Sequence, residues 1–126
     1  MPSSGETLYV ADGYDQYYTS KFTVNNYGNV NYFMKFVDID TGETAVTFFV
    51  RANSNVTVTV PGTDLELRYA YGTTWYGEEL LFGDATRYAR DEESYDFYNY
   101  TYTVSFETTL NIGEGMNVEG INAGEF

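Results

Sequence analysis

The sequence predicts an all-β protein, a β-sandwich of about six to eight antiparallel strands with one long aromatic loop over residues 72–90. Three observations lead to this fold class. Apolar residues alternate with polar ones over most of the chain, which is typical of half-buried strands. Turn-forming residues separate these runs at short intervals. No segment longer than a few residues has helical periodicity, and 126 residues fit a single domain.

Two strands are expected near the N-terminus, over 7–11 and 17–24, with Asp12 and Gly13 at the turn between them. The same third of the chain is crowded with tyrosine. The rings exceed what one small core can bury, and tyrosine is enriched at interfaces, so we expect an interface there, with self-association through open β-edges. These tyrosines are Tyr9, Tyr14, Tyr17, Tyr18, Tyr27 and Tyr32.

The alternation over 31–38 and 44–52 predicts a hairpin, because residues 40–43 between them are Asp, Thr, Gly and Glu. This turn superficially resembles the start of a calcium-binding loop. A valine-containing strand follows it at once, where such a loop needs further ligands, so a simple turn is favoured.

A second hairpin is predicted between 55–60 and 65–71, joined by a Pro-Gly turn at 61–64. One long strand is predicted over 94–109, where five apolar or aromatic residues fall on one face and polar residues on the other. The face expected to meet the core comprises Tyr98, Tyr100, Tyr102, Val104 and Phe106.

The domain organisation follows from where the alternation stops. Residues 1–110 are expected to form a single β-sandwich domain, and residues 111–126 an acidic Gly/Asn-rich C-terminal tail without regular structure. Three apolar residues of the tail, Val118, Ile121 and Phe126, are the ones that could attach it to the body of the domain.

The segment 72–90 breaks the pattern, with no alternation, three glycines and the only tryptophan. Long connections in compact domains usually bind something or fold on their own side chains. In the favoured interpretation Trp75, Leu80, Leu81 and Phe82 close one open end of the sandwich as an apolar plug. In the functional interpretation the loop is an aromatic binding platform. Its candidate binding residues are Trp75, Tyr76, Glu78, Glu79, Phe82, Arg87 and Tyr88.

The same region carries a resemblance that covers residues 44–97. The segments that carry it are Val58-Thr59-Val60-Pro61-Gly62, Leu65–Gly72, Trp75-Tyr76-Gly77-Glu78-Glu79 and Leu81-Phe82-Gly83. They resemble a group of uncharacterised small bacterial or phage proteins in which a membrane or zinc-ribbon segment precedes a β-rich module. The valine strand leading into Pro-Gly is more weakly similar to Cna-B-like and carboxypeptidase-regulatory-like surface domains. These resemblances imply a module of a longer chain and no active-site residue.

Composition excludes several kinds of chemistry. The chain contains no histidine and no cysteine, which removes the usual general base, the Ser-His-Asp and Cys-His arrangements, and the common zinc sites. Paired carboxylates such as Glu66, Glu78 and Glu79 remain, but 126 residues leave little room for the deep cleft of a glycosidase. We therefore expect a protein that is not an enzyme and needs no cofactor or metal. Whether the acidic run 91–96 binds a divalent cation stays open.

The net charge limits the classes of partner that we expect this protein to bind. Nineteen acidic residues against six basic ones give a net charge of −13, so we expect neither nucleic-acid binding nor direct membrane insertion. Our leading hypothesis is a non-catalytic extracellular or surface module, part of a longer anchored chain, that serves adhesion or assembly with a protein or glycan partner. The alternative is a soluble acidic inhibitor, phage-encoded and cytoplasmic in an infected host, that occupies a basic site on a host protein.

Overall fold

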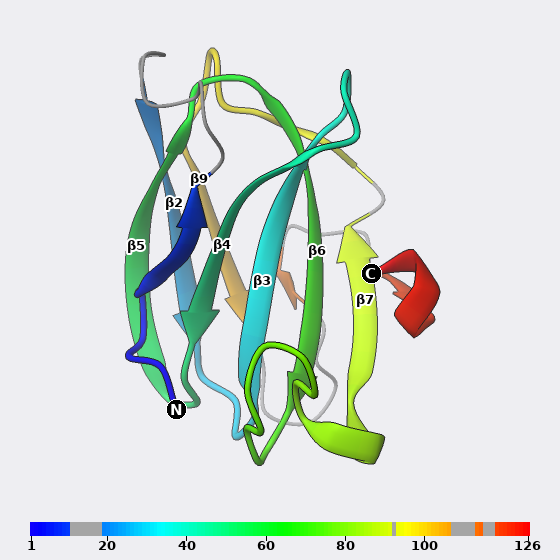
Figure 1. The fold of residues 1–126 in the computed structure, drawn as a ribbon. Coiled ribbons are helices and arrows are strands. Elements are labelled where there is room, and N and C mark those ends of the chain that lie inside the picture. The colour runs from blue at the N-terminus through cyan, green and yellow to red at the C-terminus, as the bar shows by residue number, and fades with distance from the viewer. Residues whose placement is uncertain (11–18, 92, 107–112, 115–117) are drawn as a thin grey trace.

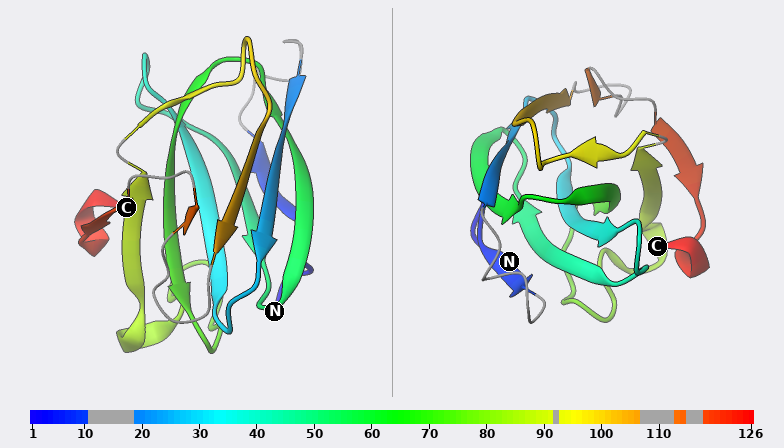
Figure 2. Two further views of the ribbon diagram at one scale, coloured as in Figure 1. Left: turned by 180° about the vertical axis from the view of Figure 1, so that it is seen from behind. Right: turned by 90° about the horizontal axis from the view of Figure 1, so that it is seen from above.

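The computed structural model describes residues 1–10, 19–91, 93–106, 113–114 and 118–126, and it confirms the all-β sandwich. Two sheets lie face to face, as Figures 1 and 2 show. Within the described residues no helix is both long and apolar enough to cross a membrane. The only helical turns in those residues are two 3₁₀ turns, η2 (Gly83–Ala85) and η3 (Ala123–Glu125).

The larger sheet, here called sheet A, has the order β1-β4-β3-β6-β7-β11, and β8 pairs with the start of β6. All of these pairs are antiparallel. Its strands are β1 (Thr7–Val10), β4 (Thr44–Val50), β3 (Asn31–Asp38), β6 (Asp64–Gly72), β7 (Arg87–Asp91), β11 (Val118–Ile121) and β8 (Tyr95–Asp96).

The smaller sheet, sheet B, has the order β10-β9-β2-β5. Its strands are β10 (Gly113–Glu114), β9 (Tyr102–Phe106), β2 (Thr19–Asn26) and β5 (Ser54–Pro61). The pair β2–β9 is parallel, which departs from the all-antiparallel expectation. Seen from behind, β5, β2 and β9 lie side by side (Figure 2, left).

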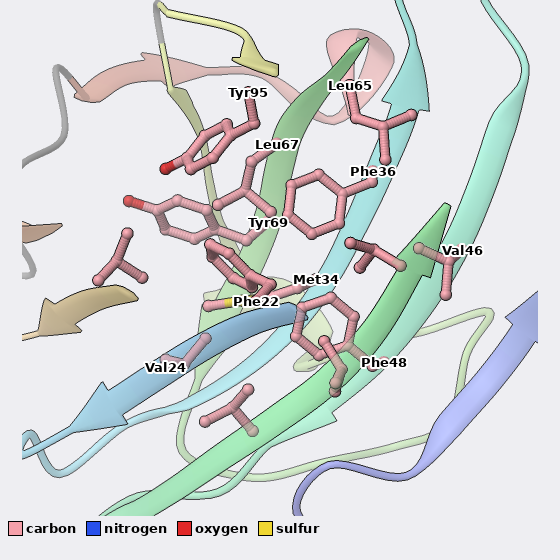
Figure 3. Packing of buried hydrophobic residues seen from close by; sticks show 14 of the residues in the cluster. Phe22, Val24, Met34, Phe36, Val46, Phe48, Leu65, Leu67, Tyr69 and Tyr95 are labelled. Carbon is pink, nitrogen blue, oxygen red and sulfur yellow. The ribbon is translucent and has the colours of Figure 1, made fainter. Parts of the chain in front are cut away.

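The hydrophobic core fills the space between the sheets. Figure 3 shows side chains from β2, β3, β4 and β6 converging there. Phe22 from sheet B meets Phe36 from sheet A edge-to-face, with 4.9 Å between ring centroids. Such aromatic pairs contribute about 1 kcal/mol beyond the area they bury. The strands β2, β3, β5, β6 and β9 therefore contribute every second residue to this core, as the alternation predicted.

The hairpin predicted between 31–38 and 44–52 is confirmed by the pairing of β3 with β4. Its turn is held by Asp38, whose Oδ1 accepts hydrogen bonds from the backbone N–H groups of Asp40 (2.8 Å) and Thr41 (3.3 Å). Gly42 has a φ of 77°, the left-handed region that favours glycine. The aspartate and glycine thus serve turn geometry, as the sequence indicated.

The second predicted hairpin is wrong. β5 pairs with β2 in sheet B, whereas β6 pairs with β3 and β7 in sheet A. The short connection at residues 62–63 carries the chain from one sheet to the other. Alternation cannot distinguish the two arrangements, because both keep the same residues toward one core.

The long strand predicted over 94–109 is also wrong in extent. β8 ends at Asp96 in sheet A and β9 begins at Tyr102 in sheet B, so the chain changes sheets between them. Asp96 holds this crossing, because its carboxylate accepts from the backbone N–H (3.2 Å) and the side-chain amide (2.8 Å) of Asn99. Tyr98 and Tyr100 are consequently exposed, while Val104 and Phe106 face the core as expected.

The tail contains regular structure in its described part, contrary to the expectation. β10 pairs with β9, and β11 pairs with β7 at the edge of sheet A. Of the tyrosines expected at an interface, Tyr32 is fully buried and Tyr27 is exposed. Tyr14, Tyr17 and Tyr18 lie outside the described residues.

Candidate functional site

The connection between β6 and β7, residues 73–86, is the β6–β7 loop, shorter than the predicted segment because Gly72 belongs to β6 and Arg87 begins β7. It does not close an open end of the sandwich. Phe33, Phe49 and Ala70 point away from the inner core, and the loop covers them with Leu81 and Phe82 to form a second buried cluster. The loop therefore gives sheet A an apolar cover on its outer face.

Trp75 is the centre of this cover. Its ring stacks on Phe33 with 5.7 Å between centroids and meets Phe49 edge-to-face at 4.9 Å. Phe82 contacts the same indole at 5.3 Å. A half-buried tryptophan held by three aromatic rings anchors the loop, which supports the plug interpretation of this residue at a different place in the fold.

A small residue in β6 allows the loop to approach the sheet. A Cβ atom on Gly72 would lie 2.6 Å from Cβ of Phe82, closer than two carbon atoms can pack. Glycine at this position therefore allows Phe82 to contact the sheet closely. It does not serve a turn in the backbone.

The backbone of the loop is internally hydrogen-bonded. The N–H of Tyr76 donates to the carbonyl of Leu81, and the N–H of Leu81 donates to the carbonyl of Gly77, both at 2.7 Å. The Thr86 hydroxyl accepts from the N–H of Phe82 (2.9 Å) and donates to the carbonyl of Gly83 (2.7 Å). Leu81 has a φ of 53°, an uncommon conformation that concentrates at functional and switch regions of proteins.

The solvent side of the loop presents two large side chains to water. Tyr76 is 59% exposed and Leu80 is 66% exposed. Between them lies a shallow, open depression of about 490 Å³. Its lining is Tyr76, Leu80, Phe82, Gly83, Asp84 and Ala85.

The structure divides the seven predicted binding residues. Trp75 and Phe82 are part of the cover, and Tyr88 packs beside it against Phe126 with 5.4 Å between ring centroids. Tyr76, Glu78 and Glu79 are exposed, and Arg87 is exposed at the start of β7. The described loop thus has an apolar anchoring side and a polar, solvent-facing side.

Sequence reasoning misplaced Leu80 and missed Asp84. Leu80 was expected in the plug, yet it is the most exposed large apolar residue of the loop. The available signal was its place directly after two glutamates, because a residue in an exposed acidic turn seldom enters a core.

One carboxylate of the acidic run 91–96 is buried at the end of β7. Asp91 is buried, and its carboxylate accepts from the Tyr95 hydroxyl at 2.6 Å and from the Glu93 N–H at 3.1 Å. Burial, and then the hydrogen bond to Asp91, raise the pKa of Tyr95 well above its usual value. Among the described residues no group of three or more acidic side chains is arranged to hold a metal ion.

No protein-family model matches this chain, and no curated protein or solved structure is significantly similar to it.

Proposed function

We propose that this protein is a non-catalytic binding module of the kind used outside the cell for adhesion or assembly, and that the β6–β7 loop docks on a basic protein surface. The observation that carries the proposal is the exposure of Tyr76 and Leu80 on a loop that is anchored from beneath. Exposed apolar side chains grouped on one surface commonly mark interaction sites.

The anchoring supports binding because it reduces the entropy lost on association. Trp75 and Phe82 fix the loop to sheet A, and the hydrogen bonds of Leu81 and Thr86 hold its backbone. A preorganised loop has fewer conformations to lose when a partner binds. The two exposed side chains are therefore presented in a defined geometry before the partner arrives.

The charge around the loop suggests the partner's chemistry. Glu78, Glu79 and Asp84 are exposed on the loop, and the whole chain carries a net charge of −13. Complementary potentials steer association and select partners. A basic protein surface with a small apolar recess for Tyr76 or Leu80 fits this face. The depression is too shallow to enclose a drug-sized ligand.

Selection from a displayed random-peptide library tests the proposal. We expect peptides rich in Lys and Arg, with an apolar residue, to be enriched on the wild-type protein. Binding should fall at least about tenfold for the double variant Tyr76→Ala/Leu80→Ala, since this tenfold corresponds to about 1.4 kcal/mol. The matched control, Tyr27→Ala, removes an equally exposed tyrosine away from the loop and should leave binding unchanged.

Two outcomes of this selection would contradict the proposal. Enriched peptides that bind the double variant as well as the wild type would remove the loop from the site. Failure to enrich peptides, combined with Tyr76-dependent binding on a glycan array, would replace the protein partner with a carbohydrate.

The alternative hypothesis, an acidic inhibitor, uses the same exposed face of the β6–β7 loop but predicts a different kind of binding site on the partner. The carboxylates of Glu78, Glu79 and Asp84 would then occupy an anion-binding site on a host protein. Glu78→Gln/Glu79→Gln should abolish such binding, whereas in the adhesion module it should chiefly slow association and reduce its salt dependence.

A further inference from the structure

The shallow depression on the β6–β7 loop combines three kinds of surface that a single cationic side chain can use. Tyr76 supplies an aromatic ring, Leu80 an aliphatic wall and Asp84 a carboxylate. All three residues are exposed. Recognition sites usually pair an apolar lining with a few polar groups that fix orientation. The depression therefore suits a ligand group that is apolar along its length and positively charged at its end.

The carboxylate of Asp84 is available to such a ligand. Asp84 lies in the 3₁₀ turn η2 and is exposed. Among the described residues its side chain makes no hydrogen bond and no ion pair. Arg87, the basic residue that follows it in the sequence, does not pair with it. Both carboxylate oxygens are thus free to accept hydrogen bonds from a partner.

The backbone of the loop places the Tyr76 ring beside this carboxylate. The ring lies against Gly83, where an added Cβ atom would be 3.0 Å from Cε2 of Tyr76. Asp84 is the next residue after Gly83. The hydrogen bond from the Tyr76 N–H to the Leu81 carbonyl, at 2.7 Å, holds the two parts of the loop together. The ring is therefore supported by backbone on one part of its surface and borders the depression with the rest.

These surfaces match a guanidinium group better than an ammonium group. A guanidinium is planar, so it can stack on an aromatic ring while its edge donates two parallel hydrogen bonds to a carboxylate. It is also more weakly hydrated than an ammonium, which favours it in a depression that stays open to water. Its aliphatic stem can lie along an apolar wall such as Leu80.

We propose that the depression accepts an arginine side chain of a partner protein, with the guanidinium stacked on Tyr76 and hydrogen-bonded to Asp84. The inference rests on the proposed function, because it names the group that the β6–β7 loop recognises on a basic protein surface. Asp84 contributes the only carboxylate to the lining of this depression. The net charge of −13 attracts cationic partners to the whole chain, whereas this one carboxylate gives the site its specificity.

Titration with N-acetyl-arginine amide tests the site without knowledge of the partner. Heteronuclear NMR spectra of the full-length protein should show saturable shifts at the backbone amides of Gly83, Asp84 and Ala85. The citrulline amide has nearly the same shape but no charge, so it should bind at least about tenfold more weakly. The lysine amide should bind at least about threefold more weakly, because its ammonium neither stacks nor forms the paired hydrogen bonds.

Two aspartates supply a matched pair of variants. Asp84→Asn and Asp40→Asn each remove one negative charge from an exposed residue. Asp40 lies in the turn between β3 and β4, at the opposite end of the sandwich from the β6–β7 loop (Figure 1). Asp84→Asn should weaken binding of the arginine amide about tenfold or more, and Asp40→Asn should change it less than about twofold. Equal effects would show a response to net charge alone and would overturn the site.

Two substitutions at Tyr76 test the stacking. Tyr76→Phe keeps the aromatic ring and should retain the affinity for the arginine amide. Tyr76→Leu keeps an apolar side chain without a ring and should lower that affinity at least about threefold. Because Tyr76 is exposed, both variants should fold like the wild type, as the unchanged NMR shifts of the core will show. Equal affinities of the two variants would overturn the stacked arrangement.

Two results distinguish this inference from the proposed function. Displayed peptides that need Tyr76 and Leu80 but bind Asp84→Asn as well as the wild type would keep the loop as a docking surface and overturn its arginine site. Asp84-dependent binding of the arginine amide, without enrichment of any basic peptide, would keep the site and remove the basic protein surface as partner. The absence of saturable shifts up to the solubility limit of the arginine amide, or equal affinity for the lysine amide, would overturn the inference.

Discussion

The two outer faces of the sandwich differ in a way that explains most of the molecule. The outer face of sheet A carries Phe33, Phe49 and Ala70 and is covered by the β6–β7 loop. In the described strands of sheet B, the outer face carries mainly hydroxyl and amide side chains, several of which are exposed. Thr23 and Thr57, for example, hydrogen-bond to each other across β2 and β5 at 2.9 Å. Sheet A therefore lies between two covering layers, sheet B and the β6–β7 loop, whereas sheet B is covered by sheet A on its inner face.

The difference teaches how to recognise a covered sheet in a sequence. In β5, exposed residues alternate with buried valines, as expected for a strand with one wet face. In β3 and β4 nearly every residue is buried, on both faces. A strand that is apolar on both faces needs two covers. One is sheet B, and the other is the loop whose sequence showed no alternation.

The largest expected effect is a loss of stability at high pH. It acts on the core between the two sheets and therefore on the whole sandwich. Burial raises the pKa of Tyr32, Tyr69 and Tyr95 above the ordinary value of 10. Above pH 10 the unfolded chain binds fewer protons than the folded one. The stabilisation is complete below pH 10 and should fall above it by about 4 kcal/mol per pH unit for the three tyrosines.

Urea titrations between pH 8 and 11 measure this decline. Tyr69→Phe is the control, since its hydroxyl has no hydrogen-bond partner among the described residues and its loss should cost little at pH 7. The same substitution should reduce the slope by about a third. A free energy of unfolding that stays constant through pH 11 would show that these rings are not buried.

The next prediction compares one substitution on the outer face of sheet A with one on the outer face of sheet B. Phe49→Ala should destabilise the protein by about 4 kcal/mol, because Phe49 is completely buried beneath Trp75 and Phe82. Thr57→Ala on the open face should cost less than about 1 kcal/mol. Denaturant unfolding of the two variants measures both. Similar costs would mean that the loop is not a cover.

Adjacent residues of the loop sharpen the same contrast. Trp75→Ala should cost about 2 to 3 kcal/mol because three rings contact the indole, whereas Tyr76→Ala should cost less than about 0.5 kcal/mol. Trp75 is the only tryptophan, so its emission reports on this site alone. We expect blue-shifted fluorescence with restricted iodide quenching. Emission at the wavelength of free tryptophan would favour the platform over the anchor.

The smallest effect concerns the approach of the loop to β6. Gly72→Ala should cost about 2 kcal/mol, because the added Cβ collides with Phe82. Gly120→Ala, in the strand β11 of the same sheet, meets nothing within 4 Å and should change stability by less than about 0.5 kcal/mol. Thermal unfolding distinguishes the two. Equal shifts would place Phe82 away from the sheet.

The candidate site was predictable only in part. The absence of alternation over 72–90 indicated an irregular segment, and Tyr76, Glu78 and Glu79 are exposed on it. Trp75 and Phe82 belong to its anchor instead. An aromatic residue in a loop fits either role, because the choice depends on whether another element offers apolar surface. That surface, Phe33 and Phe49, comes from strands distant in the sequence.

The sequence by itself determined the all-β class, the hairpin of β3 and β4, and the inward face of β5, because each depends on side-chain alternation or turn chemistry between neighbours. Only the tertiary structure decided that β5 and β6 belong to different sheets, that β9 runs parallel to β2, and that β11 pairs with β7 and brings Phe126 over Lys35. The reason is physical. Alternation with a period of two residues shows which side of a strand is apolar, but it does not show which other strand pairs with it.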